Sequence, residues 1–187
     1  MPKCIIICAP SGAGKTSITK YLLQQNLKLM FSVSACTREK RAGEENGKDY
    51  YFLTPQAFKQ KIAANEFVEW EEVYTDQFYG TLKTEIERIW QQRNHVIFDV
   101  DVEGGLSLKN YFKENALTIF VKAPSIEILE ARLRKRGTET EEKILKRLTK
   151  VEKEMSYADK FDVIIVNDVL ENAQQKTQEV VSTFLKK

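Results

Sequence analysis

The sequence predicts an α/β protein with a parallel sheet at its core and helices on both faces of that sheet. Short, nearly continuous apolar runs such as "IIIC" at 5–8 and "VIIV" at 163–166 are typical of strands buried on both faces. Amphipathic segments of helical period separate these runs, which favours parallel strands joined by helical crossovers. The glycine-rich turn "APSGAGKT" at 9–16 follows the first run and precedes the first helical segment, as in a phosphate-binding loop.

The composition is that of a globular chain and argues against several classes of protein. Of its 187 residues, 42% are hydrophobic and 30% are charged, enough for one domain with a substantial core. The net charge of +2 argues against a nucleic-acid coat protein. Cys4, Cys8 and Cys36 fit neither a disulfide framework nor a zinc site, and the N-terminal apolar run is too short for a signal segment or a membrane span. We therefore expect a reduced, cytoplasmic protein that binds neither nucleic acid nor membranes.

The first elements alternate as this fold class requires. A strand at 5–8 leads to a helix at 14–25, in which Ile18 and Leu22 share one face. A short strand is expected next, at 31–33.

The segment 34–93 interrupts this alternation with mixed short elements, so we expect a lobe inserted into the core. Its stretch 37–52 is charged, punctuated by glycine and without helical period. Thr54 followed by Pro55 predicts a helix start, because threonine caps free amides and proline suits the first helical position. Further short elements are expected at 67–68, 73–74 and 81–93, the last being an amphipathic helix.

The alternation resumes after this lobe and continues to the end of the chain. Ser125 predicts a helix N-cap and Gly137 a helix stop. Strands are expected at 96–100, at 117–121 and within "FDVIIVND" at 161–168. Helices are expected at 103–112, 125–137, 141–157 and 169–185.

The turn at 9–16 is the strongest local indication of chemistry, although a glycine-rich turn with an incidental lysine is the alternative. Gly12 and Gly14 let backbone amides approach phosphate oxygens at a helix start. Lys15 can reach the β- and γ-phosphates of a nucleotide, and Thr16 offers its hydroxyl to Mg²⁺. Ala9 stands where such loops usually begin with glycine, but its methyl group is harmless at the negative φ that we expect. The nucleotide is expected to contact Ala9, Pro10, Ser11, Gly12, Ala13, Gly14, Lys15 and Thr16.

The stretch "FDVD" at 98–101 places two carboxylates at the end of a core strand. Open α/β sheets bind ligands at the carboxyl ends of their strands, so Asp99 is expected to join Thr16 in holding Mg²⁺. Asp101, two residues on, either faces the ligand or caps the next helix.

Two segments carry arginines that can hold phosphate groups, since the guanidinium presents a fork of donors. Arg38 and Arg41 lie in the charged loop, although composition alone would fit a solvated surface. Arg132 and Arg136 are one helical turn apart, and Arg147 lies on the next helix. A mobile arginine-bearing segment suits a phosphoryl transferase, and a salt-bridged surface helix is the alternative.

These pieces, in this order, resemble the guanylate kinase family over nearly the whole chain. "SVSACTREKRAGEENGKDYYF" is similar to the family's nucleotide-monophosphate segment, "NEFVEW" and "FYGT" to the rest of that pocket, and "RGTETEE" to its lid. The resemblance implies one domain with a phosphate-loop parallel sheet core, an inserted mixed α/β lobe that binds the monophosphate, and a helical lid. The core would span 1–33, 94–125 and 158–187, the lobe 34–93 and the lid about 126–157.

The resemblance implies Mg²⁺-dependent phosphoryl transfer from ATP to GMP, and to dGMP, by a monomer or homodimer. A carboxylate such as Glu69 can accept from guanine N1–H and N2–H₂ together, whereas adenine lacks that donor pair. The guanine edge would be met by Ser34, Glu69 and Thr81, with Asp101 close by. The GMP phosphate would be met by Arg38, Arg41, Tyr50 and Tyr79, with Glu44 in the same segment. The transfer would be served by Lys15, Arg38, Arg132, Arg136 and Arg147, and the adenine would lie near Asn167 and Asp168.

Three residues depart from the family's pattern, and two alternatives stay open. Ala9 replaces a glycine, Lys40 stands where proline is common, and Glu103 replaces a glutamine, which adds negative charge near the substrate cleft. A non-catalytic module of the same family would bind partner proteins, but the presence of Lys15 argues against it. A kinase of the same fold could act on another monophosphate, and Glu69 argues against that.

Overall fold

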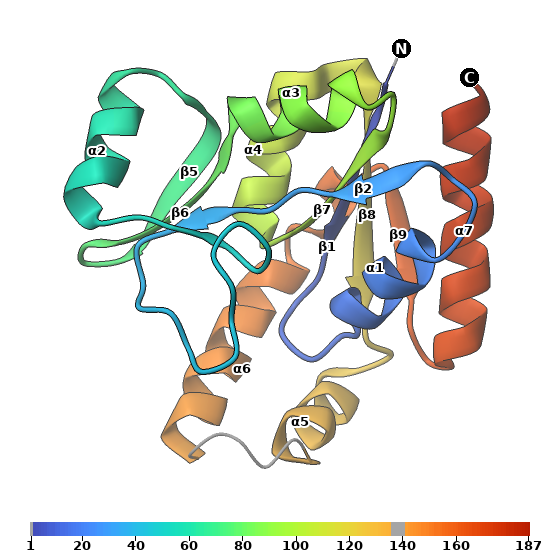
Figure 1. The fold of residues 1–187 in the computed structure, drawn as a ribbon. Helices are drawn as coiled ribbons and strands as arrows, with labels where there is room; N and C mark the ends of the chain where they lie inside the picture. The colour runs from blue at the N-terminus through green and yellow to red at the C-terminus, as the bar shows by residue number, and fades with distance from the viewer. Residues whose placement is uncertain (1, 136–140) are drawn as a thin grey trace.

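The structure is a computed structural model that describes residues 2–135 and 141–187. Its core is a five-stranded sheet in the order β2-β7-β1-β8-β9, with every neighbouring pair parallel (Figure 1). The strands are β1 (Cys4–Cys8), β2 (Leu29–Phe31), β7 (His95–Val100), β8 (Ala116–Lys122) and β9 (Val163–Val166). The predicted fold class is therefore confirmed.

Helices cover both faces of this sheet, because the side chains of its central strand alternate between two apolar clusters. Ile5 and Ile7 belong to one cluster, and Ile6 belongs to the other. The first cluster includes residues of α1 (Lys15–Leu23) and α7 (Leu170–Lys186), and the second includes residues of α3 (Lys83–Gln91) and α4 (Val102–Phe112). Both faces of β1 are thus buried, as its apolar sequence predicts.

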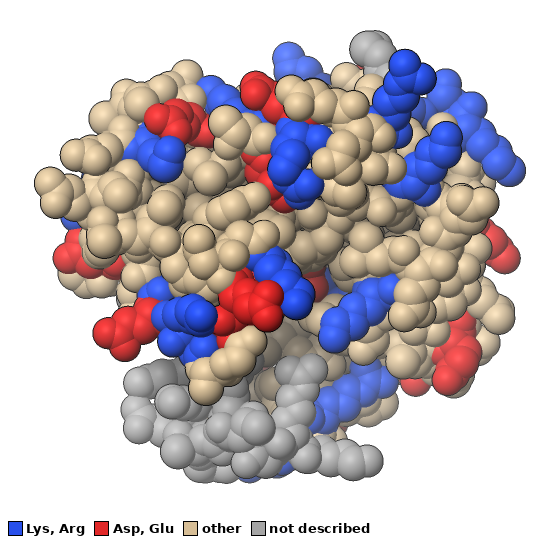
Figure 2. All heavy atoms as spheres, viewed as in Figure 1, with Lys and Arg blue, Asp and Glu red and all other residues tan. Residues whose placement is uncertain are grey.

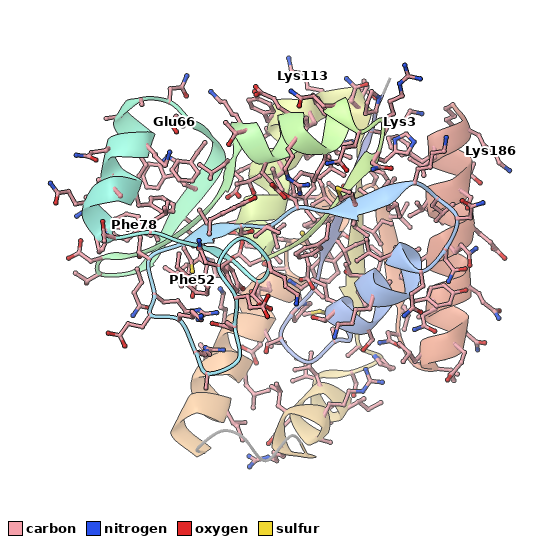
Figure 3. All side chains as sticks on the ribbon, in the orientation of Figure 1. Lys3, Phe52, Glu66, Phe78, Lys113 and Lys186 are labelled. Carbon is pink, nitrogen blue, oxygen red and sulfur yellow. The ribbon has the colours of Figure 1, made fainter. Side chains whose placement is uncertain are left out.

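A second sheet, of order β4-β3-β6-β5, builds the inserted lobe. It comprises β3 (Ala35–Cys36), β4 (Tyr51–Phe52), β5 (Phe67–Tyr74) and β6 (Gln77–Leu82), and α2 (Pro55–Ala63) packs on it. Phe58 of α2 stacks on Phe67 and Phe78, with ring centroids 4.3 and 5.3 Å away. Figure 3 labels Phe78 beside α2. Thr54 caps α2 as expected, accepting a 3.1 Å hydrogen bond from the Ala57 amide.

Some predicted boundaries were wrong. The apolar pieces at 67–68 and 73–74 belong to one continuous strand, β5, which forms a hairpin with β6. The helix expected at 81–93 begins at Lys83, because Thr81 and Leu82 still pair with β5. The short strand expected at 31–33 lies at Leu29–Phe31.

Two further helices, α5 (Ile126–Lys135) and α6 (Glu141–Met155), lie below the core in Figure 1. Two single 3-10 turns, Lys113–Asn115 and Ala158–Lys160, precede β8 and β9. The Ser125 hydroxyl accepts a 3.3 Å hydrogen bond from the Ile128 amide, which confirms the predicted cap. The helix stop expected at Gly137 lies outside the described residues.

The cysteines and the surface charges agree with the composition. Cys4 and Cys8 of β1 and Cys36 of β3 are buried and unpaired. Figure 2 shows basic and acidic side chains interspersed on the visible face of the molecule. None of the helices within the described ranges combines the length and apolar character that a membrane span requires.

Candidate active site

The glycine-rich turn lies between β1 and the N-terminus of α1. Gly12 and Gly14 have φ of 90° and 100°, a left-handed region that favours glycine, and Gly14 is the N-cap of α1. A β-carbon on Gly14 would also collide with the Asn167 amide. Ala9 is buried and is not among the residues with positive φ, so its methyl group causes no backbone strain. The loop therefore keeps the shape that presents the first amides of α1 to an anion.

Lys15, Thr16 and Asp99 converge beside this loop. The Lys15 ammonium lies 2.5 Å from Asp99 Oδ1, and it donates a 2.8 Å hydrogen bond to the carbonyl of Val100. The Thr16 hydroxyl donates to Asp99 Oδ2 at 3.1 Å. Parallel pairing of β1 with β7 explains this proximity, because Ile7 lies opposite Asp99 and both strands end at the same edge of the sheet. Asp99 thus lies where the sequence predicts a ligand-binding carboxylate.

A hydroxyl beside a carboxylate is a donor set that suits Mg²⁺, which is bound by one or two carboxylates together with substrate phosphates. Thr16 and Asp99 provide such a pair at the mouth of the loop. Across residues 2–135 and 141–187, no group of three His, Cys, Asp or Glu side chains is arranged to hold a metal by itself.

Asp101 takes the capping role, one of the two that the sequence left open. Its Oδ1 accepts a 2.9 Å hydrogen bond from the Gly104 amide and caps α4, and the residue also lines two cavities. A cavity of about 420 Å³ is lined by the glycine-rich loop together with Asp99 and Asp101. A second cavity, of about 280 Å³, is lined by Ser34, Tyr50, Glu69, Tyr79, Asp99 and Asp101 among others. The two aspartates therefore mark the boundary between the loop cavity and the lobe cavity.

Glu69 is one of two acids of the lobe cavity, with Glu71, whose pKa is raised to about 7. Burial raises the pKa of Glu69, although the hydrogen bond from Thr81 opposes this shift. The Thr81 hydroxyl donates to Glu69 Oε1 at 2.7 Å, because the two residues pair directly across β5 and β6. Thr81 is fully buried and does not line the lobe cavity, so its hydroxyl orients Glu69. An ionised carboxylate has about four acceptor sites, so Glu69 keeps acceptor capacity on both oxygens beyond the hydrogen bond from Thr81.

The charged loop at 37–52 is organised around an ion pair. Arg38 donates two hydrogen bonds to Glu44, at 2.7 and 2.6 Å, and the backbone amide of Arg41 donates a third, at 2.9 Å. The Arg38 hydrogen bonds hold the pKa of Glu44 at about 2. The guanidinium of Arg38 also lies over the ring of Tyr50, 4.8 Å from its centroid, and Tyr50 is 6.1 Å from Tyr79 centroid to centroid. Arg38 is therefore held by Glu44 and packs on Tyr50, and Tyr50 and Tyr79 line the lobe cavity.

The residues expected near the adenine are tied to the loop and to α5. Asn167 is buried and donates a 2.7 Å hydrogen bond to the carbonyl of Ala13, while Arg132 donates to the carbonyl of Asn167 at 3.1 Å. The Asp168 carboxylate accepts from the Val169 amide at 2.6 Å. Two predicted site residues are not fully described by the structure: Arg136 lies outside the described residues, and only the backbone of Arg147, in α6, is described.

Sequence reasoning missed Glu85, a buried carboxylate of α3. It is 2% exposed and accepts hydrogen bonds from the Val33 amide at 3.0 Å, the Tyr51 hydroxyl at 2.9 Å and Arg88. Glu85 therefore links Val33, which follows β2, to Tyr51 of β4 in the lobe sheet. Its position next to the apolar Ile86 in an amphipathic helix was the only feature of the sequence that could have indicated its burial.

A sequence model described as guanylate kinase matches residues 1–184 of the chain. The chain belongs to the guanylate kinase family. It is 51% identical over 185 residues to a guanylate kinase of Bacteroides thetaiotaomicron, covering 99% of the chain and 91% of the relative. It is 50% identical over 188 residues to a guanylate kinase of Porphyromonas gingivalis, covering 100% of both. The crystal structure of guanylate kinase from Anaplasma phagocytophilum superposes with a TM-score of 0.79 at 26% identity, covering 100% of this chain and 87% of that one.

The structure gives a partner to Glu103, which we expected to add negative charge near the substrate cleft. Its carboxylate accepts a 2.9 Å hydrogen bond from the Lys153 ammonium of α6. The added negative charge is therefore paired with a cation of the helix that faces it.

Proposed function

We propose that the chain is a guanylate kinase that transfers the terminal phosphoryl group of ATP to GMP, giving ADP and GDP. Family membership supports this activity, and one structural observation carries the assignment of sites. Two cavities meet at Asp99 and Asp101, one built by a phosphate-binding loop and the other by a lobe that offers a buried carboxylate. A donor nucleotide and an acceptor nucleotide in these cavities would bring their phosphates together at that boundary.

The loop cavity takes the donor. Backbone amides at the start of α1 bind the ATP phosphates, and Lys15 follows the β- and γ-phosphates with its ammonium group. Thr16 and Asp99 would hold Mg²⁺, which would supply charge neutralisation of the nucleotide phosphates. Asn167, which is hydrogen-bonded to the carbonyl of Ala13 in this loop, and Asp168 would lie near the adenine.

The lobe cavity takes the acceptor. Glu69 accepts from guanine N1–H and N2–H₂, and Ser34 donates to O6, a pairing that adenine cannot reproduce. The GMP phosphate is held by arginine and tyrosine donors that carry little mutual repulsion once the phosphate is bound. These donors are Arg38, Arg41, Tyr50 and Tyr79, and Glu44 keeps Arg38 in position.

In the transfer, a phosphate oxygen of GMP forms a bond to the γ-phosphorus of ATP as the bond from that phosphorus to the β–γ bridging oxygen breaks. The resemblance assigns Arg132, Arg136 and Arg147 to the transfer, in which their charges would offset the charge on the transferring group. Closure of the lid and the lobe excludes water, which would otherwise compete as acceptor.

The test is a coupled assay of ATP with GMP, dGMP, AMP, CMP and UMP. GMP should exceed AMP by at least ~10²-fold in kcat/KM, because AMP leaves the buried Glu69 without its donor pair. Arg41→Lys should weaken use of all monophosphates alike, since it contacts phosphate and not base. Equal use of GMP and AMP would refute the assignment of the acceptor. Location in the cytoplasm, the monomeric or dimeric state and the boundaries of core, lobe and lid stay predictions.

A further inference from the structure

Lys150 belongs to the lid helix α6, yet its side chain lines the loop cavity together with Lys15 and Asp99. Its ammonium nitrogen lies 3.6 Å from Asp101 Oδ2 and 3.6 Å from Glu154 Oε1. Both separations are too long for hydrogen bonds, in contrast to the 2.5 Å contact of Lys15 with Asp99. The Lys150 side chain is 54% exposed, so its charge is held loosely at the cavity wall.

The charges that line this cavity give Lys150 a function. Among the described lining residues, three carboxylates (Asp99, Asp101 and Glu154) face two ammonium groups, those of Lys15 and Lys150. Lys15 is already engaged with Asp99 and with a backbone carbonyl. A polyphosphate in this cavity would lie beside three like charges, an arrangement that costs free energy unless cations offset it.

The environment of Lys150 keeps it charged. Burial by itself would lower the pKa of Lys150, but Asp101, Glu154 and Glu71 outweigh it and raise the pKa above its usual value. Glu154 lies one helical turn away on α6 and is buried, so its carboxylate lies beside the ammonium group without a hydrogen bond to it.

We propose that Lys150 is a further phosphate-contacting residue of the ATP site, delivered from α6. This inference rests on the proposed function. In the nucleotide-free chain, Asp101 and Glu154 hold the ammonium group at the cavity wall. When ATP is bound, the flexible stem of the lysine turns its donors to the polyphosphate, and a charge-assisted contact replaces the two long ion pairs.

Lys153 provides a matched control on the same helix. It lies three residues further along α6 and forms a 2.9 Å ion pair with Glu103 of α4, so it also links the lid to the core. It lines a neighbouring cavity with Val102 and Tyr157. That cavity shares Asp101, Lys150 and Glu154 with the loop cavity, but Lys153 itself is not among the residues that line the loop cavity. Replacing Lys153 therefore removes one positive charge and one ion pair between α6 and the core, but it leaves the charged residues that line the loop cavity unchanged.

The experiment compares wild type with Lys150→Met, Lys150→Arg and Lys153→Met in the coupled assay, with thermal unfolding of each variant. Lys150→Met should lower kcat/KM for ATP at least tenfold, the loss expected for a hydrogen bond to a charged group. Its Kd for GMP, measured without ATP, should stay within threefold of wild type. Lys150→Arg should keep at least a third of the wild-type kcat/KM for ATP. The kcat/KM of Lys153→Met for ATP should stay within threefold of wild type. If Lys150→Met fails to fold, Lys150→Gln takes its place.

Equal losses of kcat/KM for ATP in Lys150→Met and Lys153→Met would overturn the inference, since they would show that each lysine acts only by linking α6 to the core. A kcat/KM for ATP within threefold of wild type in Lys150→Met would overturn it as well. Calorimetric binding of ATP without any acceptor separates this inference from the choice of GMP. There, at least fivefold weaker binding by Lys150→Met supports the phosphate contact even if the acceptor assignment fails, and unchanged binding overturns it.

Discussion

Lowering the pH from 8 to 6 should weaken GMP binding about tenfold through Glu69 alone. Burial raises the pKa of Glu69 to about 7, and only its ionised form can accept from both guanine donors. With a pKa of about 7, the ionised fraction is about ten-elevenths at pH 8 and about one-eleventh at pH 6. The ratio of these fractions is the expected change in Kd.

Calorimetric titration of GMP at pH 6, 7 and 8, with wild type and with Glu69→Gln, measures this effect. The phosphate of GMP titrates near pH 6 as well, and the variant supplies the correction because it keeps that contribution and lacks the carboxylate. At pH 8 the variant should bind GMP at least ~10-fold more weakly, since an amide offers one acceptor oxygen and no charge. The ratio of the two Kd values should then shrink about tenfold on going to pH 6. A ratio that stays constant over this range would refute the reasoning.

Four other changes have defined outcomes. Glu69→Gln should have a larger free energy of unfolding than wild type at pH 8, by about 3–4 kcal/mol at most, because the native pKa of Glu69 is raised from 4.5 to about 7 and wild type loses stability as the pH rises through this range. This gain should vanish below about pH 4.5, and thermal unfolding of both proteins measures it. Lys15→Met should fold normally and lose at least ~10²-fold in kcat, measured with saturating GMP. Ala9→Gly should change the Kd for ATP by less than about tenfold, since backbone amides bind the phosphate; a large gain in affinity would mean that Ala9 strains the loop. Glu85→Ala should lower the free energy of unfolding in urea by about 2–3 kcal/mol, because buried donors of Val33 and Tyr51 lose their acceptor.

The core and the loop cavity could be predicted from sequence because their signals are local. Continuous apolar runs indicate strands buried on both faces, and the position of Asp99 at the end of such a run places it at the ligand-binding edge. Thr54 and Ser125 indicate their helix starts for the same reason, since a cap acts within a few residues.

The lobe could be predicted less well, because its structure depends on pairing between strands. Thr81 fits an amphipathic helix when read along the chain, and its place in β6 follows only from its register opposite Glu69. That register also decides that the Thr81 hydroxyl meets the carboxylate, a contact twelve residues apart in sequence. Glu85 and Lys150 were missed for a related reason, since charged residues on amphipathic helices are ordinarily solvated and their partners lie on other elements.

Burial of the three thiols gives the chain natural reporters for the opening of each sheet. Burial raises the pKa of Cys4 to about 12, and it also raises the pKa values of Cys8 and Cys36. The folded chain therefore supplies little of the thiolate that alkylating reagents attack, and labelling requires local unfolding. Cys36 lies in the lobe sheet, whereas Cys4 and Cys8 lie in the core sheet. Iodoacetamide labelling followed residue by residue with mass spectrometry would thus measure how much GMP stabilises the lobe and how much it stabilises the core, without any introduced probe.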